Sequence, residues 1–598
     1  MKTDSLSLKN LFVFEKRWVV PLYQRPYVWR EEEQWAPLWD DVRTIAERRV
    51  AGQPARAHFL GAVVLEQLPT PASRIDARLV IDGQQRLTTL QLAIAALRDL
   101  CRTEGDDESV KWLLKLSEND EVQDPESEER FKVWPTNVDR PAYRIVADPR
   151  SADAPAQKLR AARAAGPSRI ADAYGYFHDR FREWSDAEGD PLLRRRALRD
   201  TLRDSLYLVV IDLEKDDEAQ IIFETLNARG TPLLPMDLVK NHLFHAAAGA
   251  GADLDRLYEK HWRELDERSD YWRADVRQGR LNRPRIDVFL QHYLTMRSGD
   301  EVPATHLFTV FKEQAETDTR SAEEQLRELI RHARVFAAFS SAPERSRKQL
   351  FFKRLTVLDT TTVYPFLLDL YAREEERGAA LDAILGDLES YLVRRLVCQL
   401  TTKRYNQLFL ALMNAVREGS EPPARTARAF LLAETSETSR WPDDDEFRKA
   451  WFSVPIYQAI TRPRLRMLLE ALEAATQSDL SEDIELRGNL SVEHLMPQSW
   501  ETGGWPLPPR VGAFEATNRR ESLLHTFGNL TLLKQKLNTI QSNRPWAEKR
   551  TLIRQHGVLA LNRQLQDVEH WDEEAIEMRS LSLFEKATRI WPRPEPVV

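Results

Sequence analysis

A glutamate and a histidine stand side by side in the segment SVEHLMPQSW, residues 491–500. Hydrolysis of a phosphodiester needs a base that activates water and a divalent cation that stabilises the developing charge. His494 suits the base, because an imidazole titrates near neutral pH, and Glu493 can offer a hard oxygen ligand to Mg²⁺. A lone Glu–His pair is usually a surface accident, so the interpretation depends on the residues downstream of it.

The second part of this constellation is the segment LHTFGNLTLLKQKLN, residues 524–538, with two separated asparagines. Asn529 precedes an apolar, strand-like run, where its amide can tie the loop and orient His494. Asn538 lies in an expected helix and can offer its carbonyl oxygen to the metal. His525 is a further candidate ligand, although a histidine in such a place is more often structural. An EHxxPQ block followed by GNL and a second asparagine is far more specific than the pair alone.

Basic side chains are enriched around these motifs. Residues 485–550 include nine Lys and Arg against six Glu and no Asp, whereas the whole chain has 86 Lys and Arg against 94 Asp and Glu, a net charge of −8. An acidic protein does not attract DNA through its overall field, so local patches must supply any contacts. Lys549 and Arg550 are candidates for contacting a phosphate.

A separate candidate site is the turn Asp82-Gly83-Gln84-Gln85-Arg86, which joins an apolar strand to a helix. Free N–H groups at a helix N-terminus attract anions, and a glycine lets a ligand approach the backbone. Arg86 can form paired hydrogen bonds to a phosphate, and Asp82 can hold a metal or a ribose. The alternative is a helix capped by Asp82, with Arg86 in a surface ion pair. On these residues alone the alternative is favoured, since short glycine motifs give many false positives.

A later segment also places polar groups among apolar ones near a turn. Asn227 and Arg229 lie in FETLNARG, residues 223–230, and Lys240 comes later in TPLLPMDLVKN. The alternative interpretation is a helix cap, a turn and a new helix after Pro235. Together with the glycine turn, these residues shift the balance towards a nucleotide site.

Aromatic side chains dominate the segment YQRPYVW, residues 23–29. The rings and their polar neighbours could line a pocket that reads a modified base or backbone. The equally weighted alternative is an aromatic core with a turn at the proline. The candidates for contacting modified DNA are Tyr23, Gln24, Arg25, Pro26 and Trp29.

The elements that must position these residues are strands and helices of ordinary length. The patterns predict strands at 18–22, 58–65, 78–81 and 206–213, and a helix at 87–97. Residues 250–400 indicate successive amphipathic helices, and the polar stretch 418–445 predicts a boundary or a long loop. The expected fold class is therefore mainly α with α/β parts, the α/β part lying near the N-terminus.

Length and composition bound the remaining possibilities. A chain of 598 residues with 42% hydrophobic and 30% charged residues predicts several ordinary folded domains. Cys101 and Cys398 form no CxxC pair, which excludes a cysteine-ligated zinc site. The first twelve residues lack the apolar core of a signal peptide, and no run approaches the roughly 18–20 apolar residues that span a bilayer. We therefore expect a cytoplasmic protein with no membrane partner.

Three motifs in order, YQRPYVW, IDGQQRLTTL and FETLNARGTPLLPMDLVKNHLF, resemble the N-terminal half of the GmrSD family of type IV restriction enzymes. The resemblance implies a domain like the ParB and sulfiredoxin fold, associated with hydrolysis of a nucleoside triphosphate. Residues 82–86 would line the nucleotide site. In single-chain relatives of the phosphorothioate-sensing type, the region that matches residues 23–29 is associated with detecting modified DNA. The residues implied to lie near the nucleotide are Asn227, Arg229, Asp237 and Lys240.

The C-terminal pattern resembles the HNH, or ββα-metal, nucleases, and most of all the C-terminal domain of the same family. By this resemblance His494 is the general base, Asn529 the central asparagine and Asn538 the last residue of the motif. The chain has Glu493 where many HNH enzymes have Asp, and Asn538 where many have His. Both are competent metal ligands, and the longer glutamate leaves direct ligation open.

Together the two resemblances imply three domains. These are a ParB/sulfiredoxin-like nucleotide-binding and modification-sensing domain over 1–248, a helical domain over 249–440 and an HNH nuclease domain over 441–598. The implied function is modification-dependent nicking or cutting of double-stranded DNA with Mg²⁺ or Mn²⁺ in anti-phage defence. It would be coupled to binding and hydrolysis of a nucleoside triphosphate, with GTP favoured, and a homodimer would explain double-strand cuts. Two alternatives stay open: an HNH nuclease with a degenerate nucleotide site, and a non-catalytic DNA-binding or scaffold protein.

Overall fold

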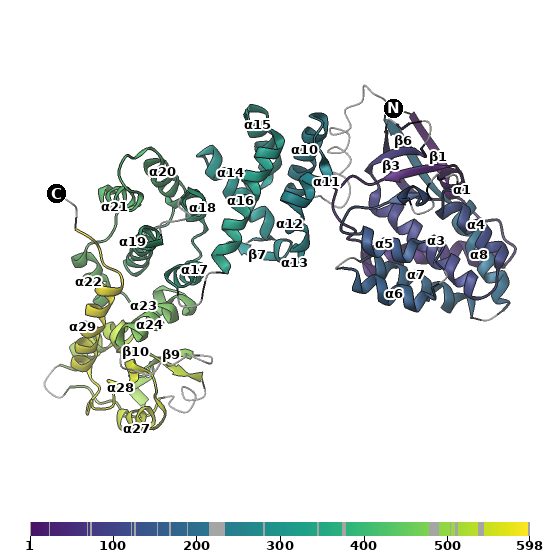
Figure 1. Ribbon diagram of the computed structural model, residues 1–598. Coiled ribbons are helices and arrows are strands. Elements are labelled where there is room, and N and C mark those ends of the chain that lie inside the picture. Colours follow the sequence, from purple (N-terminus) through teal and green to yellow (C-terminus); the bar gives the residue numbers. More distant parts are fainter. Residues whose placement is uncertain are drawn as a thin grey trace. The chain divides into compact units, whose positions relative to one another are not determined.

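A computed structural model describes most of the chain as two compact units, residues 1–274 with 311–327 and residues 275–310 with 328–598 (Figure 1). The residues predicted as a separate helical domain are shared between these units, and the three-domain division stays a prediction. The structure describes all residues except 1, 23, 69, 72–73, 121, 123, 125–126, 152, 167–168, 188, 214–233, 279–280, 342, 344–345, 374–377, 478–489, 503, 509–511, 536–542 and 596–598.

The first unit is built on a six-stranded mixed sheet in the order β1-β6-β3-β4-β2-β5. The predicted strands at 58–65, 78–81 and 206–213 are confirmed. The one predicted at 18–22 instead ends at Val19, because the proline two residues later has no N–H to donate to a ladder. The strands are β1 (Lys2–Ser7), β2 (Lys16–Val19), β3 (His58–Gln67), β4 (Asp76–Asp82), β5 (Val133–Trp134) and β6 (Leu206–Leu213).

The order of the strands brings two of the predicted motifs together. β2 and β4 are parallel neighbours, and the carboxyl ends of parallel strands meet at the same edge of a sheet. The chain that leaves β2 contains residues 24–29, and β4 runs directly into the turn at residues 82–86. The aromatic segment and the glycine turn therefore lie side by side, although they are far apart in the sequence.

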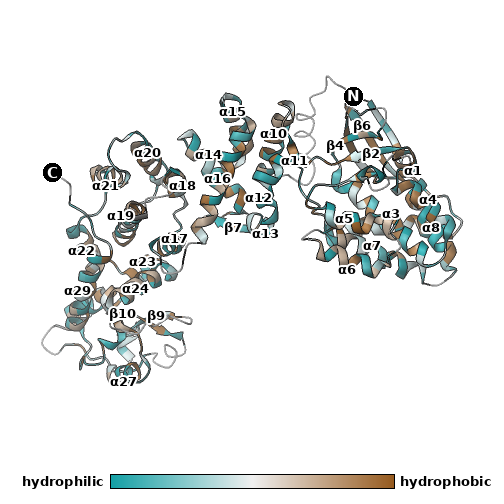
Figure 2. Ribbon diagram, in the orientation of Figure 1, coloured by the Kyte–Doolittle hydropathy of each residue, from teal (hydrophilic) through white to brown (hydrophobic). Residues whose placement is uncertain are grey.

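Helix α3 (Gln84–Thr103), which begins in the glycine turn, is the central helix of this unit. Nearly all of its side chains are buried, as expected of a helix that is largely apolar all round. Many other helices show alternating hydrophobic and hydrophilic stretches (Figure 2). The helices around α3 are α1 (Leu8–Phe12), α2 (Ala36–Val50), α4 (Asp107–Ser117), α5 (Arg140–Ala147), α6 (Pro155–Ala164), α7 (Ile170–Ser185) and α8 (Pro191–Asp204).

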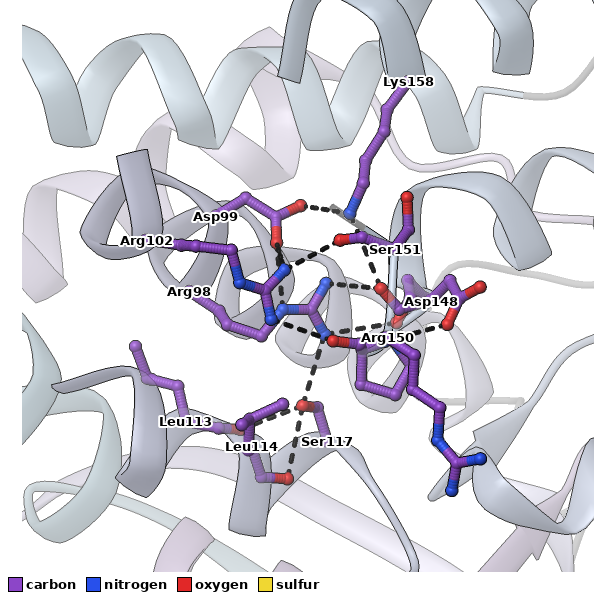
Figure 3. A network of polar contacts seen from close by, with 12 residues as sticks. Arg98, Asp99, Arg102, Leu113, Leu114, Ser117, Asp148, Arg150, Ser151 and Lys158 are labelled. Carbon is purple, nitrogen blue, oxygen red and sulfur yellow. Dashed lines mark hydrogen bonds and ion pairs between the residues drawn. The ribbon is translucent and has the colours of Figure 1, made fainter. Parts of the chain in front are cut away.

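A buried polar network fixes the C-terminal half of α3 (Figure 3). The carboxylate of Asp99 accepts from Arg98 Nε at 2.9 Å and from Lys158 Nζ at 2.8 Å. Arg98 and Arg102 also donate to the carbonyl groups at and just after the end of α5. Buried charges are tolerated when they are paired and hydrogen-bonded in this way. The helix that carries the glycine turn is thus anchored at its opposite end.

Short helices complete the first unit, and the second unit is mainly helical. Up to residue 274 the first unit also contains α10 (Pro235–Gly249), α11 (Leu254–Leu257), α12 (Arg263–Glu267) and α13 (Ser269–Trp272), and residues 311–327 of the next helices belong to it as well. The chain continues through β7 (Asp275–Gln278), β8 (Leu281–Pro284), α14 (Arg285–Ser298), α15 (Leu307–Thr317), α16 (Ala322–Ser340), α17 (Arg347–Leu358), α18 (Tyr364–Arg373), α19 (Gly378–Val397) and α20 (Tyr405–Glu418). It ends with α21 (Pro423–Ala433), α22 (Asp444–Ser453), α23 (Ile456–Ala459), α24 (Arg462–Thr476), β9 (Leu490–His494), α25 (Ala513–Leu524), β10 (Leu530–Lys534), α27 (Trp546–His556), α28 (Ala560–Arg563) and α29 (Glu573–Ile590).

The expectation of a long loop at 418–445 is wrong, because α21 lies within that stretch. The domain boundary expected there stays a prediction. Pro423 occupies the first position of α21, where the missing N–H costs nothing. Ala427 and Leu431, four residues apart, form its buried side. The polar residues on either side of α21 hide this short helix when only composition is considered. The mainly helical fold class with an α/β part near the N-terminus is confirmed.

The helices and the two cysteines can be compared with what the composition led us to expect. Among the described residues, no helix is both long enough and apolar enough to cross a bilayer. Cys101 and Cys398 are both free thiols, the first of them buried. A disulfide framework therefore plays no part in this fold.

Candidate functional sites

The first candidate site lies on the antiparallel ribbon of β9 and β10 in the second unit. Leu530 stands opposite His494 in this ribbon, and Thr531 stands opposite Glu493. Beyond the ladder, the N–H of Leu495 donates to the carbonyl of Asn529 at 2.9 Å. Neighbouring side chains on a strand point to opposite faces, so Glu493 and His494 contact different groups.

Asn529 ties together the two loops next to the ribbon. The side chain is fully buried, and its Oδ1 atom accepts from the N–H of Met496 at 2.8 Å and from Trp571 Nε1 at 3.1 Å. Its Nδ2 atom donates to the carbonyls of Met496 and Leu524, both at 2.9 Å. The chain just after His494 is therefore held to the turn that precedes β10.

The neighbouring Gly528 is required by packing against α29. A Cβ atom at this position would lie 2.2 Å from the carbonyl oxygen of Ile576. Arg579, on the same helix, donates from Nη1 to the carbonyls of Gly528 and Leu530, both at 2.8 Å. Burial lowers the pKa of Arg579 to about 9. These contacts explain the Gly-Asn pair of the motif as a loop clamped between β10 and α29.

His494 contacts a second histidine. Its Nε2 atom lies 3.1 Å from Nδ1 of His525, and the ring of Tyr457 packs edge-on against it, with centroids 4.2 Å apart. Burial, and after it the charges of His525, Lys549 and Arg462, lowers the pKa of His494 to about 3. The imidazole is therefore neutral at neutral pH and can accept a proton.

Glu493 faces the opposite side of the ribbon, where α27 packs. Lys549 Nζ lies 3.1 Å from its Oε1 atom and also donates to the carbonyl of His494 at 2.8 Å. The lysine side chain is fully buried, and burial lowers its pKa while Glu493 raises it. The ammonium group of Lys549 is therefore bound within the protein and is not exposed to contact a phosphate. Arg550 donates to the carbonyl of Val568 at 3.2 Å.

Arg462 and Tyr457 join this site from an earlier part of the chain. The guanidinium of Arg462 lies over the Tyr457 ring, 3.2 Å from its centroid, and donates to the Tyr457 carbonyl. The N–H of Tyr457 donates in turn to the carbonyl of His525 at 3.1 Å. Neither residue belongs to a motif that the sequence singles out, and only the fold reveals their position.

The donors available for a metal lie on both faces of the ribbon. Within the part of the chain that the structure describes, no group of three or more His, Cys, Asp or Glu is arranged to hold a metal ion. The carboxylate of Glu493 is the hard oxygen donor of this region. Asn538, the other predicted ligand, lies outside the described residues.

The second candidate site is the glycine turn of the first unit. Gly83 has a positive φ of 93°, and a Cβ atom there would lie 2.5 Å from Val63 Cγ1. The glycine is therefore required by both conformation and packing on β3. The guanidinium of Arg86 lies close over Gly61 and donates to the carbonyl of Ala62. Gly83 itself is the N-cap of α3, which has no side-chain cap, so Asp82 does not cap the helix.

Glutamines interlock the turn with the neighbouring aromatic segment. Gln85 accepts from the N–H of Val28 at 2.8 Å and donates to the carbonyl of Pro26 at 3.0 Å. Gln84 donates to the carbonyl of Arg25 at 3.4 Å. Gln24 donates to two carbonyls at the end of β4, at 2.7 and 2.9 Å. The two motifs thus form one structure.

The side chains of the aromatic segment divide between core and surface. Tyr27 is buried, and its hydroxyl lies 2.6 Å from that of Thr89 and accepts from Trp35 Nε1 at 2.9 Å. Trp29 is half-buried against the core. Tyr23 lies outside the described residues. The core interpretation therefore holds for Tyr27, whereas Trp29 stays partly accessible.

Arg25 is the cation that this turn leaves without a partner at one atom. Its Nε atom is buried and has no hydrogen-bond partner in the part of the chain that the structure describes, and the same holds for the Oε1 atom of Gln84 beside it. Burial lowers the pKa of Arg25, while the carboxylates of Asp237 and Asp82 raise it. Asp237 forms a two-point contact with Arg273, at 2.7 and 3.4 Å. The loop after β2, the glycine turn and the start of α10 therefore converge here.

Lys240 lies apart from this convergence. Its Nζ atom donates to Asp266 at 2.8 Å and lies 5.2 Å from the ring centroids of Tyr258 and Trp262. The ammonium group is thus enclosed by a carboxylate and two aromatic rings. Asn227 and Arg229, the other predicted residues of this region, lie outside the described residues.

Two family models match the chain, one at each site. The N-terminal domain of the GmrSD restriction endonuclease matches residues 8–244. The C-terminal domain of the GmrSD restriction endonucleases matches residues 441–586. The first match contains the glycine turn and the aromatic segment, and the second contains the β9–β10 ribbon. No curated protein matches the chain.

Proposed function

The chain belongs to the GmrSD restriction endonuclease family, whose two domain models together match more than half of its residues, and we propose that it is a modification-dependent nuclease with an HNH-type site. As a member of this family it is a restriction-type DNA endonuclease. The proposal adds three features: the residues of the nuclease site, a divalent cation, and control by a nucleoside triphosphate bound in the first unit.

One observation carries the assignment of the nuclease site. The buried amide of Asn529 holds the chain next to His494 against the turn before β10. This is the tie expected of the central asparagine in an HNH motif, and it lies within the C-terminal match. The buried imidazole of His494 is neutral and held in position, so it can accept a proton from an attacking water. Because its lowered pKa makes it a weaker base than a free imidazole, a divalent cation that acidifies the water would assist the transfer.

The paired histidines define where that proton resides. Because His494 Nε2 and His525 Nδ1 are within hydrogen-bond distance, one of them must donate and the other accept. The tautomers of the two rings are therefore coupled, and a proton taken up by either imidazole is shared by the pair. His525 acts in this scheme as a positioning residue for His494.

A hard divalent cation fits the donors of this region. Mg²⁺ usually keeps several waters and takes only one or two protein carboxylate or carbonyl ligands beside the phosphate. Glu493 and Asn538 would hold Mg²⁺ or Mn²⁺, which would stabilise the charge that develops on the phosphate. Lys549 fixes the carboxylate of Glu493 through their 3.1 Å contact.

The first unit is the proposed nucleotide site. Arg25 and Arg86 bring two guanidinium groups to the uncapped N-terminus of α3, where backbone N–H groups favour an anion. Gln84 Oε1 and Arg25 Nε, which have no hydrogen-bond partner among the described residues, are the atoms to which a polar ligand would bind in this proposal. GTP is the favoured nucleotide by family resemblance. Gln84 and Gln85 would link its binding to the segment 23–29, the proposed sensor of modified double-stranded DNA.

One observation favours a variant of this proposal. Arg86 donates to the backbone of β3 and Lys240 pairs with Asp266, so both are engaged within the protein. A site that binds a nucleotide without hydrolysing it would need fewer free cations. Release of inorganic phosphate from GTP, with and without DNA, separates the two: hydrolysis stimulated by DNA supports the coupled enzyme, and none supports a structural nucleotide.

The direct test is nicking of supercoiled plasmid by the full chain with Mg²⁺ or Mn²⁺. The substrates are unmodified, phosphorothioate-modified and sugar-modified plasmids, each with and without GTP. His494→Ala is the test variant, and His570→Ala, which removes an exposed histidine, is the matched control. Open circles with wild type and His570→Ala but not His494→Ala support the proposal. Equal inactivity of all three proteins on every plasmid favours a non-catalytic DNA-binding or scaffold protein.

A further inference from the structure

A cationic group lies over the ring of Tyr457, which contacts both histidines, and it has no carboxylate partner among the described residues. We propose that Arg462 binds a phosphate of the DNA at this site, held in place by the ring of Tyr457. This inference deepens the proposed nuclease function and rests on it. It adds a substrate-binding residue from α24, well before the nuclease motif in the sequence.

The geometry fixes where the guanidinium lies. Its carbon lies 3.2 Å from the Tyr457 ring centroid, and the group also donates to the Tyr457 carbonyl. The Tyr457 ring contacts His494 edge-on and stacks at 5.8 Å on His525. The backbone contact between Tyr457 and His525 locks this arrangement. Arg462 is therefore held near both imidazoles rather than left to move freely.

The charge of this guanidinium is not balanced by the described part of the protein. Among the described ion pairs none involves Arg462, and its side chain is exposed. Its neighbours on α24 are occupied: Arg464 donates to the carbonyl of Leu358 at 2.7 Å, and Arg466 pairs with Glu470 at 2.7 Å. On the opposite face of the ribbon, Lys549 is balanced by Glu493. Arg462 is thus the cation that an incoming anion would meet beside the histidines.

The chemistry of the group favours a phosphodiester as that anion. A guanidinium presents a planar set of donors that matches two phosphate oxygens. One face of the Arg462 guanidinium is covered by the tyrosine ring, which leaves N–H groups at its edge for a ligand. A cation that is fixed before the substrate arrives stabilises charge on the phosphate without reorganising during the reaction.

The test compares Arg462→Ala and Arg462→Lys with Arg466→Ala, a control that removes the same charge one turn along α24. Binding of a fluorescent duplex is measured by anisotropy across a KCl series in the His494→Ala background, so that no cleavage interferes. Loss of one phosphate contact lowers the slope of log affinity against log salt by about 0.9. We expect that loss for Arg462→Ala, partial retention of affinity for Arg462→Lys and no change for Arg466→Ala.

Nicking rates supply the second readout in proteins that retain His494. Arg462→Ala is expected to lower kcat/KM by about tenfold or more, the usual consequence of losing a charged hydrogen bond, and Arg466→Ala to match wild type. An Arg462→Ala protein with wild-type salt slope and wild-type kcat/KM overturns the inference. If wild type nicks no plasmid, the nuclease proposal fails, yet the salt slope still decides whether Arg462 contacts a phosphate. A midpoint of thermal unfolding equal to that of wild type shows that a variant is folded.

Discussion

Nε2 of His494 and Nδ1 of His525 lie 3.1 Å apart, close enough to share a proton. His494 is buried within the ribbon, whereas His525 is half-buried at the end of α25. The pair places the proposed base behind a more accessible imidazole. The two residues are thirty-one positions apart in the sequence, and their contact depends on the loop that Asn529 holds.

We predict that His525→Ala lowers the nicking rate, and by less than His494→Ala does. His525 fixes the tautomer of His494 but is not the proton acceptor in this scheme. We therefore expect the nicking rate to fall by about ten- to a hundredfold, at the low end of what general acid–base groups contribute. Single-turnover nicking measures it. A rate equal to wild type would show that the second ring is structural.

We predict that Asn529→Ala both unfolds more easily and loses nicking. The substitution leaves the backbone groups of Met496, the carbonyl of Leu524 and the indole of Trp571 without their shared partner. Buried unsatisfied groups of this kind cost about 2–4 kcal/mol in total. Urea unfolding checks the loss of stability, with the exposed Asn518→Ala on α25 as control. Unchanged stability would contradict the tie.

Much of the candidate nuclease site could be predicted because its motifs are local. A glutamate, a histidine and an asparagine in fixed order can be read from the sequence, and the apolar run at β10 then indicates a strand. The partners of Glu493 and His494 could not be predicted, because Lys549, Tyr457 and Arg462 come from separate helices. Their positions depend on tertiary packing, which a pattern of residue types does not encode.

In the first unit, too, the local elements could be predicted from the sequence, whereas the contacts between them could not. The strand, turn and helix at residues 78–97 were predictable from apolar runs and a glycine. The interlock of Gln85 with Pro26 and Val28 was not, because it needs the parallel pairing of β2 with β4. The sequence does not give the order of the strands, and without that order the two motifs cannot be placed at the same edge of the sheet.

We predict that Arg25→Ala weakens GTP binding by about tenfold or more, since the guanidinium supplies charged hydrogen bonds worth about 1.5–3 kcal/mol each. Isothermal titration calorimetry of the full chain measures the affinity. Arg56→Ala, at an exposed position of the same unit, is the matched control. If the affinity of Arg25→Ala for GTP equals that of wild type, the nucleotide does not bind at this turn.

We predict that the second unit loses stability in mild acid through His292. Burial lowers the pKa of His292 to about 3, and its Nε2 atom has no hydrogen-bond partner among the described residues. The folded pKa lies below the unfolded value of about 6.5, so the unfolded state takes up the proton first and stability falls as the pH drops from about 6.5 towards 3. The loss reaches about 2 kcal/mol at pH 5, since each pH unit in this window contributes about 1.4 kcal/mol.

His292→Leu removes this titration and leaves the other groups of the unit unchanged. Urea unfolding at pH 7 and pH 5 should therefore show a smaller difference in the free energy of unfolding for the variant than for wild type. The comparison cancels contributions that both proteins share. An identical pH dependence in the two proteins would mean that the side chain is not buried as a neutral imidazole.

In the proposed mechanism the two faces of β9 have different roles: Glu493 holds a metal ion and His494 accepts a proton. Plasmid nicking by wild type, Glu493→Gln and His494→Ala across a Mn²⁺ titration tests it most directly. We expect Glu493→Gln to raise the Mn²⁺ concentration for half-maximal rate by about tenfold or more. His494→Ala should lower the rate at saturating Mn²⁺ by about a hundredfold or more, without shifting that concentration. Nicking by His494→Ala at the wild-type rate would contradict this division of tasks.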